Sequence, residues 1–126
     1  MMFTIRSGSM TAVIDSVGAQ LMSLQSVDGT QYLWQGDPKY WPDRSLTIFP
    51  YVARLTDGCY RYRGELYHMP IHGFAPTAEF SVAEQTDAAI IFVLESCPAF
   101  YEQYPFLFRY SIRYRLENAT LHVEIT

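Results

Sequence analysis

The sequence predicts an all-β fold, because its aromatic content, its turn residues and its alternating side chains all favour strands over helices. Ten Tyr, eight Phe and two Trp make up 16% of the 126 residues, and aromatic side chains suit the pleated, half-buried surface of a sheet. No stretch sustains a helical 3.6-residue period. Turn-forming pairs separate short apolar or alternating segments, as in antiparallel hairpins: Ser7-Gly8, Asp28-Gly29, Asp57-Gly58, Arg63-Gly64, Thr86-Asp87 and Glu117-Asn118.

The clearest strand covers residues 106–116, where apolar and polar side chains alternate almost without exception. One face carries Phe106, Phe108, Tyr110, Ile112, Tyr114 and Leu116, and the other carries Arg109, Ser111, Arg113 and Arg115. The pattern resumes after a turn, with Leu121, Val123 and Ile125 expected to face inward on a returning hairpin strand. Residues 90–94 are all large and apolar, which predicts a strand buried on both faces.

Seven further segments show the length and composition of strands. They are residues 3–6, 10–15, 19–25, 31–34, 60–63, 66–69 and 79–84. Residues 96–103 have room for one helical turn. The chain length fits one domain over residues 1–126, and 49% apolar residues are ample for a single core.

Composition excludes several classes of partner. A net charge of −4 with 17% charged residues gives no basic surface for nucleic acid. The longest uncharged apolar run, residues 88–94, is far below the roughly 20 residues that cross a bilayer. The first residues lack a secretion pattern, and Cys59 and Cys97 have no metal-type or redox spacing. We therefore expect a cytoplasmic protein with two inert thiols, no metal and no membrane contact.

The alternation of residues 121–125 continues to the last residue without a polar tail. Two interpretations are open. Either the sheet lacks its next strands, so that an apolar edge recruits a second copy as a homo-oligomer, or a small domain simply ends on a strand.

The loop-rich segment 32–80 holds most residues able to do chemistry. His68 and His72 have the i, i+4 spacing of a helical zinc pair, but Pro70 between them argues against a helix. His68 is then a surface residue at the end of a strand. His72 lies in a turn beside Gly73, either as a structural residue or as a group that exchanges a proton near neutral pH.

Arg54 follows the apolar stretch 48–53, so its guanidinium is expected to emerge from a largely buried segment. A charge in such a place needs partners, either an internal carboxylate or the oxygens of a ligand. Trp34, Tyr40 and Trp41 suit stacking against a sugar ring or burial in the core. Asn118-Ala119-Thr120 fits the glycosylation pattern but is expected to be a turn.

Several motifs, in order, resemble the N-terminal part of the aldose 1-epimerases, or galactose mutarotases, especially bacterial members of the LacX type. The motifs are LW at 33–34, DPKYW at 37–41, IFPYVARL at 48–55, DGCYRYRGELYHMPIHGF at 57–74 and YPFLFRYSIRYRLENATLHVEI at 104–125. The resemblance implies a large antiparallel β-sandwich, called a supersandwich, that interconverts the α and β anomers of hexoses without a cofactor. It also implies that Arg54 and His72 contact the sugar and that His72 belongs to the catalytic site.

The chain departs from this family in length and at two positions. A family domain is more than twice as long, and its second histidine and its glutamate base lie beyond position 126. Ala53 stands where Asn or Gly is common, and Pro76 stands where Arg often follows HGFA. We therefore expect an aldose 1-epimerase-like chain that is truncated and inactive alone. The alternatives are a non-catalytic sugar-binding module and a half-domain completed by self-association.

Overall fold

The computed structural model describes residues 1–126 and consists of nine antiparallel strands with three short helical turns. The strands are β1 (Met2–Ser7), β2 (Met10–Asp15), β3 (Gln20–Ser26), β4 (Cys59–Tyr62), β5 (Glu65–His68), β6 (Ser81–Gln85), β7 (Ala89–Glu95), β8 (Arg109–Glu117) and β9 (Thr120–Ile125). The helical turns are two 3-10 turns, Thr56–Gly58 and Ala75–Thr77, and α1 (Pro98–Tyr101). None of these helices has the length or the apolar surface to cross a membrane.

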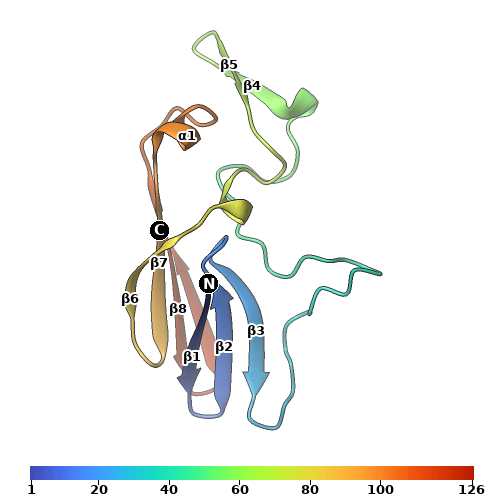
Figure 1. Ribbon diagram of the computed structural model, residues 1–126, viewed down its shortest axis with the longest axis vertical. Coiled ribbons are helices and arrows are strands. Elements are labelled where there is room, and N and C mark those ends of the chain that lie inside the picture. Colours follow the sequence, from blue (N-terminus) through green and yellow to red (C-terminus); the bar gives the residue numbers. More distant parts are fainter.

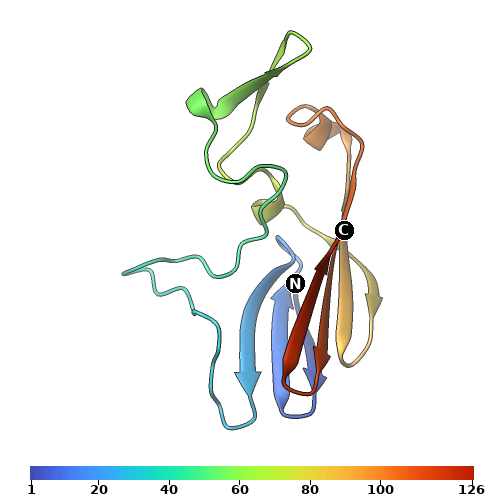
Figure 2. The same ribbon diagram turned by 180° about the vertical axis from the view of Figure 1, so that it is seen from behind.

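Two sheets face one another and form a sandwich (Figure 1). One sheet has the order β1-β2-β3, and the other has the order β6-β7-β8-β9. In Figure 2, the view from behind, β9 lies in front of the three-stranded sheet. The predicted antiparallel β-sandwich is therefore the observed architecture.

The core lies between the sheets and comes from the alternating positions of their strands. Fully buried side chains include Ile5 and Ile14 on one side and Ile90, Phe92 and Ile112 on the other. Phe3 meets Phe92 edge to face, with ring centroids 5.6 Å apart. The Tyr114 hydroxyl donates a hydrogen bond to the carbonyl oxygen of Ala19 at 2.8 Å and so joins the sheets. Burial raises the pKa of Tyr114 to about 12.

The predicted strand at residues 31–34 is wrong. Gln31 forms only an isolated bridge with Gln25. Its side-chain oxygen instead accepts hydrogen bonds from the backbone N–H groups of Leu24 and Leu33, at 2.9 and 3.1 Å. The Gln31 side chain thus satisfies N–H groups that strand pairing would otherwise use. No strand forms in residues 27–55.

Two further details differ from the sequence prediction. The strand expected from residue 106 begins at Arg109, because Phe106 and Phe108 before it pack on Tyr104 and Phe49. On the edge strand β9, Val123 and Ile125 pair with Tyr114 and Ile112 and share their inward face, as predicted, yet they remain 48% and 61% exposed. They line an apolar groove of about 400 Å³ together with Leu21 of β3 and with Ile112 and Tyr114 of β8.

The β4–β5 hairpin projects away from the sandwich in both views (Figures 1 and 2). Arg63 and Gly64, the two turn residues, have φ angles of 51° and 86°, as a tight hairpin turn requires. Tyr60 stacks on Tyr67 with centroids 5.4 Å apart, and its hydroxyl donates to the carbonyl oxygen of Gln103 at 2.7 Å. This hydrogen bond holds the hairpin against the segment that follows α1.

Candidate functional site

Two loops that are distant in sequence run side by side at the end of the sandwich. The N–H of His72 donates to the carbonyl oxygen of Ala53, and the N–H of Ala53 donates to Nδ1 of His72, both at 3.0 Å. Close to these hydrogen bonds, Phe49 and Gly73 form a parallel β-bridge. The structure therefore joins the loop that carries Arg54 directly to His72.

The backbone at this junction is left-handed at three positions. Ala53, His72 and Gly73 have φ angles of 73°, 64° and 78°. Glycine is required at position 73, because a Cβ there would collide with the carbonyl group of Phe49. The close approach of the two loops thus depends on a residue without a side chain.

An aromatic cluster fixes both loops to the four-stranded sheet. Phe49 stacks on Tyr110 of β8 with centroids 4.6 Å apart, and Phe74 stacks on Phe100 of α1 at 4.4 Å. Phe49 and Phe74 also meet edge to face at 5.8 Å. The loop with Arg54 contributes Phe49 and the turn with His72 contributes Phe74, and these two rings contact each other.

The hydrogen bond from Ala53 determines the tautomer of His72. Nδ1 accepts the Ala53 N–H, so the neutral imidazole carries its proton on Nε2. No protein group accepts a hydrogen bond from Nε2. His72 is therefore arranged as a hydrogen-bond donor that is available to a ligand.

His72 lines a cleft of about 690 Å³, the most spacious of the structure. Three segments form its walls: the start of β3, the loop 41–46 and the turn 70–77. The lining residues are Gln20, Trp41, Asp43, Leu46, Pro70, Ile71, His72, Gly73, Pro76 and Thr77. The cleft combines an aromatic ring, a carboxylate, a hydroxyl and an imidazole donor, which is a suitable set of groups for a small polar ligand.

Asp43 is a site residue that sequence reasoning missed. Its side chain is half-buried and forms neither a hydrogen bond nor an ion pair with the protein. It stands in the irregular segment 35–48, where no periodicity separates inward from outward positions. The only signal was its place directly after Trp41-Pro42 in an aromatic-rich loop.

The structure corrects the expected surroundings of Arg54. The loop around it is exposed, with Val52 67% accessible, and Arg54 itself is exposed. The explanation by an internal salt bridge is wrong, because none of the ion pairs includes Arg54. Arg54 also does not line the cleft, and it is connected to His72 only through the backbone of Ala53.

The aromatic candidates are surface residues, not core residues. Trp34, Tyr40 and Trp41 are all exposed. Trp41 alone of the three lines the cleft, and its carbonyl oxygen accepts a hydrogen bond from the Trp34 indole at 2.8 Å. Trp34 therefore helps to hold the loop that presents Trp41.

The remaining sequence predictions concern simpler positions. His68 ends β5 and is exposed, and residues 68–72 contain no helix, as Pro70 predicts. Both cysteines are free thiols. Asn118 and Ala119 form the turn between β8 and β9.

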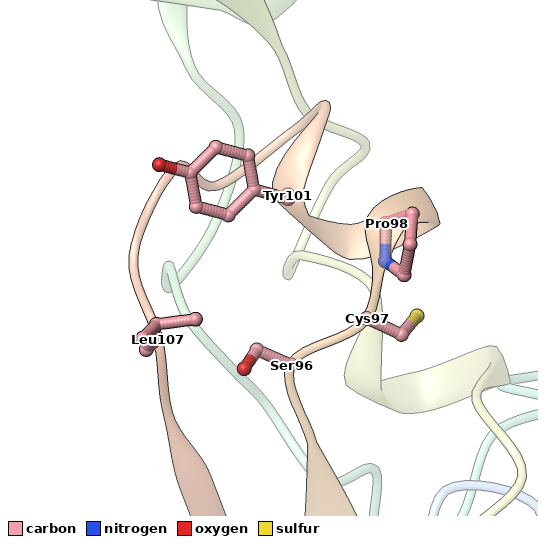
Figure 3. Close-up of a pocket in the computed structure, with 5 residues that line it drawn as sticks. All are labelled: Ser96, Cys97, Pro98, Tyr101 and Leu107. Atoms are coloured by element: carbon pink, nitrogen blue, oxygen red, sulfur yellow. The ribbon is translucent and has the colours of Figure 1, made fainter.

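A second hollow, of about 450 Å³, lies beside α1 and has mainly apolar walls (Figure 3). Ser96, Cys97, Pro98, Tyr101 and Leu107 line it. It contains no charged side chain and shares no residue with the cleft of His72. Its composition offers little that would orient a polar ligand.

Comparisons with known proteins agree along the whole chain. The family model described as aldose 1-epimerase matches residues 1–126. Protein LacX of Lactococcus lactis subsp. lactis, encoded on a plasmid, is 26% identical over 131 residues, which cover 98% of this chain and 43% of that protein. The uncharacterized protein YihR of Escherichia coli is 28% identical over 134 residues, with 97% and 42% covered.

Solved structures show the same relationship. A galactose mutarotase related enzyme from Lactobacillus acidophilus has a TM-score of 0.95 and 33% identity, with 99% of this chain and 42% of that chain covered. A galactose mutarotase-like protein from Lactobacillus casei has a TM-score of 0.94 and 29% identity, with 99% and 43% covered. The chain thus spans less than half the length of these relatives. The match to the family model over every residue, together with this shared sandwich, shows that the chain belongs to the aldose 1-epimerase family.

Proposed function

We propose that this chain supplies the hexose-binding surface of an aldose 1-epimerase-like protein, with His72 contacting the sugar. The observation that carries the proposal is the cleft that His72, with a free Nε2–H, lines together with Trp41, Asp43 and Thr77. A pyranose offers hydroxyl groups that donate and accept hydrogen bonds, and it offers an apolar C–H face. The lining of the cleft matches both parts.

Arg54 is the second proposed sugar contact. Its backbone is held beside His72 through Ala53, while its side chain is exposed and free of ion pairs. A guanidinium with no protein partner can turn toward ligand oxygens without breaking an existing salt bridge. The resemblance to the family supports the same assignment.

Turnover needs more than binding. Anomer interconversion requires a base at the C1 hydroxyl and an acid at the ring oxygen at the same time. The second histidine and the glutamate that the family resemblance implies match no position within residues 1–126. Each acid or base is typically worth about 10² to 10⁴-fold in rate, so we propose that the 126-residue chain binds sugar but barely accelerates mutarotation.

Titration and polarimetry test this proposal together. We expect saturable binding of glucose or galactose at millimolar concentration, and about tenfold weaker binding by His72→Ala because a donor to the sugar is lost. His68→Ala is the matched control, since His68 is exposed and lies outside the cleft. Polarimetry of freshly dissolved α-glucose should show no more than a slight protein-dependent acceleration.

Each result has a clear meaning. The absence of saturable hexose binding contradicts the proposal. Binding with rapid mutarotation contradicts the expected inactivity. Binding without mutarotation, whatever the chain length or the conditions, corresponds to the alternative of a non-catalytic module.

A second candidate, completion of the sheet by another copy, is favoured by the exposed apolar surface of β9. Val123 and Ile125 line the 400 Å³ groove with Leu46 and Ile48, and such an edge tends to recruit other chains. Sedimentation at micromolar concentration should then find a dimer or a larger species. Ile125→Lys should return it to a monomer, whereas Val27→Lys, a control at an exposed apolar residue outside the groove, should not. A monomeric wild-type chain contradicts this candidate.

A further inference from the structure

The charge balance of the His72 cleft is unusual for a site that would hold an anion. Asp43 is the one residue in its lining that carries a formal charge at neutral pH, and no Lys or Arg lines the cleft. The carboxylate has no protein partner. An unpaired, half-buried carboxylate offers only hydrogen-bond acceptors to whatever enters.

The nearby cations are directed elsewhere. Arg44, the next residue, donates from Nη1 to the carbonyl oxygen of Met22 at 2.6 Å. The Nζ of Lys39 lies over the ring of Tyr40, 5.2 Å from its centroid. Arg54, the second proposed sugar contact, does not line the cleft, so its guanidinium would meet only a part of the ligand that extends beyond the lining. The negative charge of Asp43 therefore has no cation to balance it within the cleft.

His72 adds the complementary group. Because its Nδ1 is occupied by the Ala53 N–H, it presents a donor at Nε2 and not a second acceptor. The cleft thus offers hydrogen-bond acceptors at Asp43 and a donor at Nε2 of His72. A hydroxyl group can satisfy either of them, whereas a phosphate or a carboxylate can satisfy only the donor and is repelled by Asp43.

We propose that Asp43 is a specificity-determining residue that accepts a hydrogen bond from a sugar hydroxyl and makes the cleft select uncharged sugars over sugar phosphates and sugar acids. This inference rests on the proposed sugar-binding function. Discrimination of this kind uses both an attractive contact to the preferred ligand and a repulsive contact to its competitor. Removal of the charge should therefore weaken the binding of uncharged sugars and strengthen the binding of sugar phosphates.

Trp41 provides a direct readout, since it lines the same cleft and is one of only two tryptophans. We would follow the indole fluorescence of the protein with both tryptophans in place, because the Trp34 indole holds the loop that presents Trp41. We would titrate this protein with glucose, glucose 6-phosphate and inorganic phosphate at constant ionic strength. The variants are Asp43→Asn and, as a matched control, Asp87→Asn, a carboxylate that lines a separate polar hollow.

We expect glucose to bind at least about tenfold more tightly than glucose 6-phosphate, since a charged acceptor contributes this much to a hydrogen bond. Asp43→Asn should reduce the preference to within about threefold, while Asp87→Asn preserves it. Circular dichroism and heat denaturation would confirm that both variants fold.

The outcomes separate this inference from the proposed function. Equal binding of glucose and glucose 6-phosphate by the wild-type protein, or an unchanged preference in Asp43→Asn, overturns the role of Asp43 while hexose binding itself stands. If neither sugar binds, the proposed function fails and the inference fails with it. Tight binding of inorganic phosphate also contradicts it, because such binding requires a cationic site.

Discussion

Gly73 shows how much of the site depends on single backbone positions. Its left-handed φ of 78° and its contact with the carbonyl group of Phe49 bring the two motif loops together. His72 and Ala53, beside it, adopt the same region of φ although they carry side chains. The junction is therefore strained in order to place the imidazole.

A methyl group at position 73 should be costly. Gly73→Ala adds a side chain in a left-handed conformation and a collision with Phe49, so we expect the free energy of unfolding to fall by about 2 kcal/mol or more. Gly29→Ala is the control, because Gly29 has a φ of 89° but no neighbouring atom within 4 Å. Denaturant titration should show a smaller loss for Gly29→Ala, and equal losses would refute the close-approach argument.

The family's preference for Asn or Gly at the position of Ala53 has a structural explanation. The Asn or Gly that is common at this position tolerates a φ of 73° better than Ala does. Ala53→Gly should therefore retain the hydrogen bonds to His72 and raise the free energy of unfolding by up to about 1 kcal/mol. Calorimetry would measure this change as a higher midpoint of heat denaturation, and a lower midpoint would contradict it.

At the scale of elements, Tyr114 is the polar link between the two sheets. Its ring belongs to the core, and its hydroxyl reaches the carbonyl oxygen of Ala19 just before β3. The pKa of Tyr114 is about 12 in the folded protein, against about 10 for an ordinary tyrosine. The folded state thus retains a proton that the unfolded state releases, and stability falls as the pH rises from 10 to 12.

The wild type should be more stable than Tyr114→Phe at pH 8 and less stable than it at pH 12. At pH 8, Tyr114→Phe loses one hydrogen bond and should be less stable than the wild type by about 1 kcal/mol. Between pH 10 and 12 the wild type should lose about 2 kcal/mol that the variant keeps. Denaturant unfolding at both pH values measures this, with Tyr60 and Tyr110 unchanged in the two proteins. Parallel pH profiles would contradict the assignment.

The elements were predictable where alternation was strong. The inward face of β8 from Tyr110 to Leu116 and the buried strand β7 follow directly from the residue pattern. The start of β8 did not, because Phe106 and Phe108 keep the alternating pattern but pack on Tyr62 and Phe49. Residues 31–34 failed because a glutamine side chain satisfied the backbone groups that a strand would have used.

At the scale of the whole molecule, the cleft arises from segments that no sequence period connects. His72 could be located from its motif, since Pro70 and Gly73 limit the local backbone. Asp43 could not, because its side of the cleft is made by an irregular loop whose path depends on contacts with β3. Sequence patterns predicted the antiparallel strands and the family resemblance implied the sandwich, whereas the site required the three-dimensional arrangement of its loops.

The β4–β5 hairpin also has a practical consequence. It stands clear of the sandwich, carries its own tyrosine stack and is closed by an exposed Arg63-Gly64 turn. A foreign peptide or a spectroscopic label introduced between these two residues would meet neither the core nor the walls around His72. The molecule therefore offers a natural handle for immobilisation or detection that leaves the cleft of His72 untouched.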